Sequence, residues 1–383
     1  MINLPKEAPL TEYLHRKAVA RGIPLSGTFE LTPCCNMACR MCYVRKTKEE
    51  QEAIAPLKSA ADWLNLAREG KKHGLLYLLL TGGEPFLRPD FREILGELHR
   101  EGFIISINSN GTMIDERVME WLVKTPPMRV NITLYGASDE TYARLCMKPD
   151  GFTLATRAIR LLRDAGIGVK INCSLTPENA ADLHGIFGFA HEEGIPVQAT
   201  SYMFPPIRRN EDIVGYNEGR FTPEEAAYQA ACILCEQKGE DWFLEMMKQN
   251  APVQMPDMLE EDCDGEGDGL RCRAGKCSFW ITWDGRMLPC GMLPASEGID
   301  VFRTGFLPSW EEVKTRTAQV RLPKGCAVCE ARDQCKACAA MVYSESGTFS
   351  KVPRYRCEMT REYPAACRRL EQEILERRMK HED

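Results

Sequence analysis

The sequence predicts an α/β fold: a partial (β/α)6 barrel followed by a small cysteine-rich domain with a β-hairpin and helices. Three observations predict it. Between residue 27 and about residue 200, short apolar runs typical of buried strands alternate six times with amphipathic helical patterns. Polar motifs follow several of these runs directly. Half of the 18 cysteines in this chain of 383 residues lie beyond residue 270.

The predicted strands cover 27–32, 75–80, 103–107, 129–134, 168–174 and 195–200. The predicted helices cover 60–73, 91–101, 115–124, 152–165 and 179–193. Strands joined by crossover helices form a parallel sheet with helices outside. Right-handed crossovers would curl this sheet into a barrel or an open partial barrel. In such folds the chemistry gathers at the carboxyl ends of the strands, which is where the polar motifs stand.

These patterns divide the chain into four segments. They are a leader with one amphipathic helix (1–26), the partial barrel (27–205), a helical linker (206–262) and the cysteine-rich domain with a C-terminal helix (263–383). The leader is too short to fold as a separate peptide-binding domain. We therefore expect a substrate to be recognised elsewhere.

Charge and apolar content exclude several partners. The net charge of −6 gives no support to a nucleic-acid surface, which needs concentrated Lys and Arg. The longest apolar stretch, at 75–80, is too short to span a membrane, and residues 1–21 lack the apolar core of a signal peptide. In a reducing cytoplasm, clustered cysteines are more typical of metal sites than of disulfides. We expect an oxygen-sensitive cytoplasmic protein.

Three cysteines at CxxxCxxC spacing, Cys35, Cys39 and Cys42, follow the first predicted strand. A [4Fe–4S] cluster normally takes four thiolates, so three leave one iron open to a non-protein ligand. Structural zinc sites are instead usually closed by four ligands. The spacing therefore favours an iron–sulfur cluster with an open iron over zinc or over loop cysteines without a ligand role.

Two short motifs stand at the ends of the next two strands. Thr81-Gly-Gly-Glu-Pro85 follows the second strand, and its glycines would let the backbone approach a ligand closely while Glu84 adds an acceptor. Asn108-Ser-Asn-Gly-Thr112 ends the third strand. Each motif alone is equally consistent with an ordinary tight turn.

The C-terminal cysteines surround a hairpin signal at Asp284-Gly285. A two-residue turn there would bring Cys277 and Cys290 to the same end of the ribbon, within reach of one cluster. Further cysteines follow as a CxxC-x5-CxxC block and one more, namely Cys326, Cys329, Cys335, Cys338 and Cys357. Paired CxxC spacing also suits structural zinc, which remains the alternative for this region.

The cysteine loop resembles the signature of the radical SAM superfamily, with Tyr43 in the aromatic place after the third cysteine. The resemblance implies that the open iron binds S-adenosylmethionine (SAM), which an electron from the cluster cleaves to methionine and a 5′-deoxyadenosyl radical that abstracts hydrogen from a substrate. It further implies SAM contacts from the loop after the second strand and from the ends of the third and fourth strands. The implied contact residues are Tyr43, Gly82, Gly83, Glu84, Pro85, Ser109, Asn110, Thr133 and Arg144. For Arg144, which would hold the methionine carboxylate with Thr133, a surface ion pair is the alternative.

The C-terminal region resembles the SPASM domain of radical SAM enzymes, although the spacing before Cys338 is x2 where the family has x3. That resemblance implies two auxiliary [4Fe–4S] clusters, three clusters in all. One would be held by Cys272, Cys277, Cys290 and Cys338, the other by Cys326, Cys329, Cys335 and Cys357. Among the remaining thiols, Cys173 near a strand end could deliver a hydrogen atom to a substrate radical, although simple packing is favoured.

SPASM proteins mostly modify peptides or proteins, so the leading hypothesis is a maturase that acts on a ribosomally made peptide. The modification would be a crosslink, an epimerisation or an oxidation. The resemblance also implies a reductant such as flavodoxin or ferredoxin. A separate leader-binding protein, or a groove between barrel and SPASM domain, would recognise the peptide. The alternatives are an anaerobic sulfatase maturase, a small-molecule dehydrogenase, and a non-enzymatic iron–sulfur or zinc module. Gly291 counts against the sulfatase maturase, because that family has an aspartate at this place.

Overall fold

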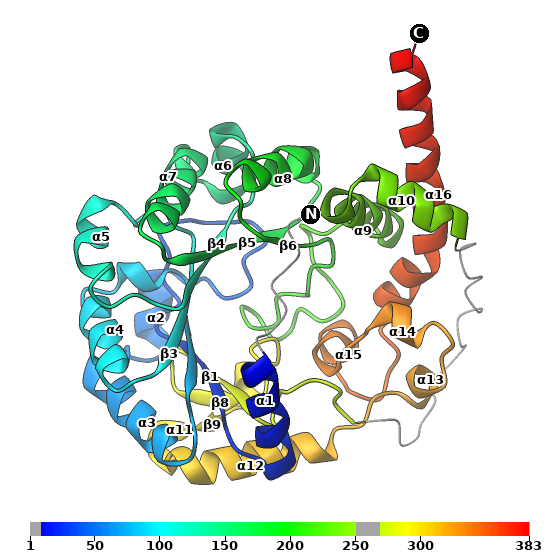
Figure 1. Cartoon of the computed structure of the whole chain (residues 1–383). Coiled ribbons are helices and arrows are strands. Elements are labelled where there is room, and N and C mark those ends of the chain that lie inside the picture. The colour runs from blue at the N-terminus through cyan, green and yellow to red at the C-terminus, as the bar shows by residue number, and fades with distance from the viewer. Residues whose placement is uncertain (1–8, 250–268, 383) are drawn as a thin grey trace.

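Residues 9–249 and 269–382, which the computed structural model describes, contain one sheet of nine strands in the order β6-β5-β4-β3-β2-β1-β7-β8-β9 (Figure 1). The strands are β1 (Ser26–Glu30), β2 (Tyr77–Thr81), β3 (Ile104–Ser109), β4 (Arg129–Thr133), β5 (Gly168–Ser174), β6 (Val197–Thr200), β7 (Ser278–Ile281), β8 (Arg286–Leu288) and β9 (Ile299–Asp300). The six strands β1 to β6 are parallel and pair in chain order. The predicted α/β fold with a partial barrel is therefore confirmed.

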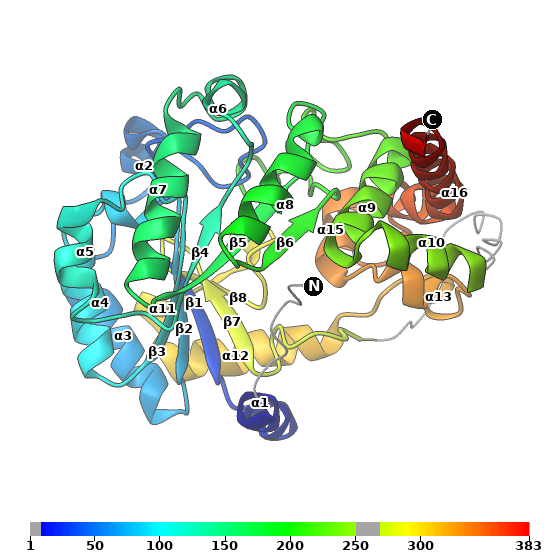
Figure 2. The ribbon, with the colours of Figure 1, turned by 45° about the horizontal axis from the view of Figure 1, so that its top comes forward.

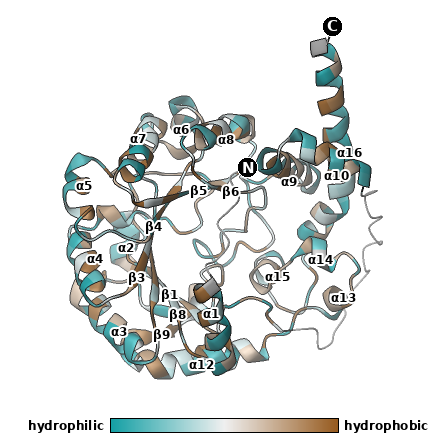
Figure 3. Ribbon diagram, viewed as in Figure 1, coloured by the Kyte–Doolittle hydropathy of each residue, from teal (hydrophilic) through white to brown (hydrophobic). Residues whose placement is uncertain are grey.

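Helices cover the outer face of the parallel strands, as Figure 1 shows for the arc from α3 to α8. The helices of this part are α1 (Pro9–Arg21), α2 (Lys48–Ile54), α3 (Ala60–Lys72), α4 (Phe91–Arg100), α5 (Glu116–Leu122), α6 (Asp139–Cys146), α7 (Gly151–Asp164) and α8 (Leu183–Glu192), with 3-10 turns η1 (Pro85–Leu87) and η2 (Ala180–Asp182). The strand side chains alternate: Ile105 and Ile107 of β3 are buried in the core, whereas Ile104 and Ser106 are less buried. Figure 3 shows the same separation of apolar strands from polar outer helix faces.

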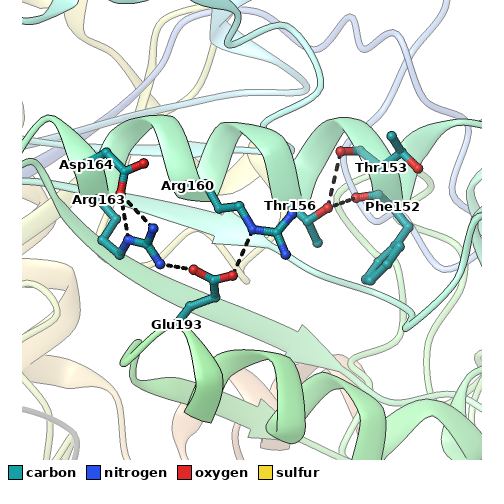
Figure 4. Close-up of polar contacts among 7 residues, drawn as sticks. All are labelled: Phe152, Thr153, Thr156, Arg160, Arg163, Asp164 and Glu193. Carbon is teal, nitrogen blue, oxygen red and sulfur yellow. Dashed lines mark hydrogen bonds and ion pairs between the residues drawn. The ribbon is translucent and has the colours of Figure 1, made fainter.

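Ion pairs on the outer layer join α7 to the end of α8 (Figure 4). The carboxylate of Glu193 accepts from Nε of Arg160 at 2.8 Å and from Arg163, and Arg163 also pairs with Asp164. Surface pairs of this kind contribute little individually, about 0–1 kcal/mol. The two helices are held mainly by the apolar core beneath them.

The hairpin continues the barrel sheet. β7 pairs in parallel with β1, so that Phe29 lies opposite Ile281, and β8 returns antiparallel to β7. The turn is longer than the predicted two residues: Thr282 bonds to Arg286, and three residues ending in Gly285 at φ +92° lie between them. The division of the chain at residue 263 stays a prediction, because Cys263 and the acidic run before residue 269 lie outside the described residues.

The remaining helices are α9 (Pro223–Lys238), α10 (Glu240–Gln249), α11 (Val301–Thr304), α12 (Phe306–Gln319), α13 (Lys324–Ala327), α14 (Arg332–Cys335), α15 (Ala339–Ser346) and α16 (Arg354–Glu382), with η3 (Ala295–Glu297). Of these, α12 packs against α3 and β8, and α11 against β9, whereas the other α-helices lie at the open side of the barrel and extend beyond it (Figures 1 and 2). Helices α9, α10 and α16 share a small apolar core that includes Ala231, Phe243 and Ile374. Within the described residues, no helix is long and apolar enough to cross a membrane.

The contact between β1 and β7 leaves no room for a side chain at Gly27. A Cβ atom there would lie 2.5 Å from Cζ of Phe279, whose ring is itself held by Phe306. We expect Gly27→Ala to lower the free energy of unfolding by about 1–3 kcal/mol, the usual cost of overpacking, in urea titrations. The matched control is Gly96→Ala in α4, where a Cβ meets nothing within 4 Å. That change should stabilise by up to about 1 kcal/mol, and equal effects of the two would contradict the contact.

Candidate active site

The cysteine loop lies between β1 and α2, and its three thiols are close enough to affect one another. Burial, the carboxylate of Glu84 and the charges of Cys39 and Cys42 raise the pKa of Cys35 to about 12. Thiols with so high a pKa become thiolates only when a cation replaces the proton. An iron cluster supplies such a charge.

The loop Gly82-Gly83-Glu84 packs directly against the cysteine loop. The amide of Gly83 donates to the carbonyl of Thr32 at 2.6 Å, and the amide of Glu84 donates to that of Cys34 at 2.9 Å. A Cβ atom on Gly82 would lie 2.3 Å from the Thr32 oxygen, and one on Gly83 would lie 2.2 Å from the Cys34 oxygen. The two glycines are therefore required by backbone contact with the cysteine loop.

The Glu84 side chain is fully buried and its oxygens are bonded within the protein. Its Oε1 accepts from the Ser109 hydroxyl at 2.9 Å and the Phe86 amide at 3.2 Å, and its Oε2 accepts from the Asn110 amide at 2.8 Å. The carboxylate thus ties the end of β2 to the end of β3, and buried Pro85 starts η1 beside it. This arrangement supports a positioning role, and a direct contact of Glu84 with SAM stays a prediction.

Asn110 reaches from the end of β3 to the cysteine loop. Its Nδ2 donates to Oδ1 of Asn36 at 2.8 Å and lies 3.6 Å from Sγ of Cys35. Asn36 in turn donates to the Thr112 hydroxyl at 2.8 Å. The Asn-Gly segment is therefore attached to the first cysteine, and Asn36 is a participant that spacing alone did not reveal.

Cys146 is a second residue that the sequence did not reveal. It ends α6, and its carbonyl accepts from the amide of Ala38 at 3.0 Å inside the cysteine loop. A hydrogen bond with the Cys146 thiol, together with burial, raises the pKa of Cys39. No motif places Cys146 there, because the contact depends on how α6 packs.

Thr133 and Arg144, which are predicted to hold the methionine carboxylate, make contacts within the protein, and their role toward that carboxylate stays a prediction. The Arg144 guanidinium donates to the carbonyl of Glu178 at 2.9 Å and lies 3.9 Å from Glu140, with 46% of its side chain exposed. Thr133 ends β4 and accepts at its carbonyl from Tyr142 at 3.3 Å. These contacts agree with the surface alternative for Arg144.

Cys173 is 2% exposed in the main core. It alternates along β5 with Asn172 and Ser174, which are less buried, and its neighbours in the core include Ile171 and Leu175. Burial raises its pKa to about 12. The placement supports packing and gives no support to a role as hydrogen donor.

The C-terminal thiols gather in two sets. Burial, together with the charges of Cys338 and Cys272, raises the pKa of Cys290 to about 11. Burial, together with the charges of Cys335, Cys326 and Cys329, raises the pKa of Cys357 to about 12. Cys338 is thus near Cys290 although it follows Cys335 closely in the chain. Cys277 is fully buried and packs beside Ala18 and Leu25 of the α1 region, and its ligand role stays a prediction.

Iron–sulfur clusters take thiolate ligands. The three thiols of the cysteine loop are donors of that type, and clusters at the two C-terminal sets stay a prediction.

Comparison with known proteins identifies the barrel. Residues 29–190 match the family model described as the Radical SAM superfamily. The barrel is a radical SAM domain, and the chain is an enzyme built on it. Such a domain implies a [4Fe–4S] cluster and SAM, and Cys35, Cys39 and Cys42 are the residues that would hold the cluster.

Two curated relatives and one solved structure illustrate the range of similar proteins. An AdoMet-dependent heme synthase of Methanosarcina barkeri is 24% identical over 340 residues, 85% of this chain and 94% of the relative. The antilisterial bacteriocin subtilosin biosynthesis protein AlbA of Bacillus subtilis is 30% identical over 197 residues, 50% of this chain and 42% of the relative. The structure of Streptococcus suis SuiB bound to precursor peptide SuiA has a TM-score of 0.64 and 16% identity, over 93% of this chain and 83% of SuiB.

The burial of Glu84 predicts a pH-dependent stability. Burial raises the pKa of Glu84 from its usual 4.5 to about 7 in the folded protein. The folded chain then binds the proton more tightly than the unfolded chain, so the free energy of unfolding falls as pH rises from about 4.5 to about 7. The loss should reach roughly 3 kcal/mol.

Urea unfolding of the reduced apoprotein at pH 5 and pH 7.5 measures this loss, and Glu84→Gln should remove it. The control is Glu93→Gln on the exposed face of α4, which should retain the wild-type pH dependence. An unchanged pH dependence in Glu84→Gln would contradict the prediction.

Proposed function

We propose that the chain is a radical SAM enzyme that modifies a peptide, held between the barrel and the C-terminal cysteine region. When bound, the cluster of the cysteine loop supplies the electron that cleaves SAM to the radical that abstracts hydrogen. The protein's own residues position the cysteine loop through Glu84 and Asn110 and provide a place for the substrate.

The observation that carries the proposal is a cavity of about 360 Å³ at the open side of the barrel. Its walls come from the end of β6 and from α9, α14, α15 and α16, and include Thr200, Leu234, Cys335, Met341 and Tyr363. Its size and mixed lining are typical of ligand sites. The cavity supports the predicted groove between the barrel and the C-terminal region.

The edge of the sheet beside this cavity favours an extended peptide. β6 pairs with β5 on one side, and no strand among the described residues pairs with its other side. The β6 residues Ala199 and Thr200 line the cavity. An extended peptide can add to such an edge through main-chain hydrogen bonds, while pockets read its side chains.

The two C-terminal thiol sets are proposed to hold two auxiliary clusters, each with four cysteines. Full cysteine ligation leaves no iron open, which favours electron transfer or structural support over direct binding of a substrate thiol. A reductant such as flavodoxin or ferredoxin and a separate leader-binding protein remain part of the proposal.

The position of Gly291 argues against a sulfatase maturase. A Cβ atom at this residue would lie 2.4 Å from Cδ2 of Trp280, so an aspartate there would require the Trp280 ring to move. The Gly291 carbonyl is also engaged, because it accepts from Arg208 at 3.0 Å. The local packing, as well as the residue type, opposes this activity.

A small-molecule reaction is the second candidate. The heme synthase relative aligns along 85% of this chain, whereas AlbA aligns along 50%. An alignment along most of the chain favours a reaction that uses both the barrel and the C-terminal region. The proposal therefore has to be tested against peptides and tetrapyrroles side by side.

The decisive experiment gives anaerobically reconstituted, reduced protein SAM and either the small peptides encoded near its gene or iron-bearing tetrapyrroles, in heavy water. We expect 5′-deoxyadenosine together with a peptide mass change: loss of two hydrogens for crosslinking or dehydrogenation, deuterium uptake for epimerisation. Tetrapyrrole conversion with unchanged peptides would replace the proposal by the second candidate. Absence of 5′-deoxyadenosine despite a full iron load would overturn both.

The cavity itself can be tested by filling it. Ala230→Trp places a large ring in the cavity wall on α9. We expect peptide modification at low peptide concentration to fall about tenfold, equivalent to roughly 1.4 kcal/mol of binding, while slow SAM cleavage without peptide is unchanged. Ala61→Trp on exposed α3 is the matched control. Equal peptide turnover in the two variants would place the substrate elsewhere.

A further inference from the structure

A buried ion pair stands where the barrel meets the hairpin. The carboxylate of Glu30, 1% exposed at the end of β1, accepts from Nη2 of Arg208 at 3.1 and 3.0 Å. Nε1 of Trp280 on β7 donates to the same carboxylate at 3.0 Å. Burying two charges costs several kcal/mol per ion before any attraction is counted. A pair of this kind adds little net stability.

Arg208 connects the pair to the first auxiliary thiol set. Its Nη1 donates at 3.0 Å to the carbonyl of Gly291, the residue after Cys290. Its Nε is buried without a hydrogen-bond partner. The guanidinium charge is therefore held one residue from a proposed cluster ligand, and hydrogen bonds satisfy it only in part.

Tyr43 follows Cys42 in the cysteine loop and is close enough to the pair to feel its charges. Burial raises the pKa of its hydroxyl, with Glu30 adding to the rise and Arg208 opposing it, and the charges of Cys42 and Cys290 act on the same hydroxyl. The ion pair therefore lies near both the cysteine loop and Cys290, to which Arg208 is bonded through Gly291.

We propose that the charges of Glu30 and Arg208 together set the reduction potential of the auxiliary cluster bound through Cys290. The inference rests on the proposed auxiliary clusters. Reduction adds one negative charge to a cluster, so a nearby cation stabilises the reduced form and a nearby anion opposes it. Arg208, bonded beside Cys290, raises the potential, and Glu30 cancels part of that effect.

The test is a potentiometric titration in which electron paramagnetic resonance reports the reduced clusters. It uses full-length protein in which Cys35, Cys39 and Cys42 are replaced by alanine, so that only auxiliary clusters give signals. In that background Arg208→Gln should lower the potential of one auxiliary cluster, and Glu30→Gln should raise it. Arg208→Lys keeps the charge and should leave the potential near that of the parent. The cluster proposed for Cys326, Cys329, Cys335 and Cys357 should not shift.

General damage to the structure would not shift the potential in opposite directions in the two single variants. Because each single change to a neutral residue leaves a buried charge unpaired, which destabilises the protein, the double variant E30Q/R208Q provides a second measurement. It buries no unpaired charge, and it should lower the potential by less than Arg208→Gln does, since Arg208 is the nearer group.

Two outcomes would overturn the inference while leaving the proposed function in place. The first is an unshifted potential in both Arg208→Gln and the double variant, and the second is a shift of the same sign in the two single variants. Absence of auxiliary iron in the parent protein would instead overturn the proposed cluster set, and the inference with it.

Discussion

The position of β1 between two parallel neighbours is the constraint on which the site depends. β2 on one side presents the Gly-Gly-Glu loop, and β7 on the other presents Trp280 and the hairpin. The loop that follows β1 carries the three cysteines, so its backbone meets Gly83 on the β2 side while Glu30 meets Trp280 on the β7 side. One strand thereby fixes the cysteine loop relative to both halves of the chain.

This arrangement explains why the glycines and the buried carboxylates are needed together. The glycines allow the two loops to touch through their backbones, and Glu84 then satisfies donors that the close approach leaves inside the protein. Buried polar groups stabilise a unique geometry only when their partners are complete. The cysteine loop is therefore held by a network that involves β2 and β3 and does not depend on the thiols alone.

The sequence was sufficient for the order of the six barrel strands and of the five helices predicted between them, because each is a local apolar pattern with its own period. The short helices α2 and α6 were not among the predicted ranges. Spacing also indicated the cysteine loop, since its three thiols lie within eight residues. It could not reveal Cys146, Asn36 or the pairing of Glu30 with Arg208, because those contacts join segments far apart in the chain. It also did not indicate that the hairpin would extend the barrel sheet, since pairing between β1 and β7 has no local signature.

Continuity of the sheet has a consequence for how the two parts of the chain can work. If the hairpin belonged to a loosely attached domain, the distance from the cysteine loop to Cys290 would vary with domain motion. Here β7 is bonded to β1, and Arg208 bonds both Glu30 and Gly291 across the junction. The proposed electron transfer would require a fixed separation between clusters, and the bonded junction at the hairpin provides one between the cysteine loop and Cys290. The proposed substrate cavity lies instead beside the unpaired edge of β6, where Cys335 also lines it.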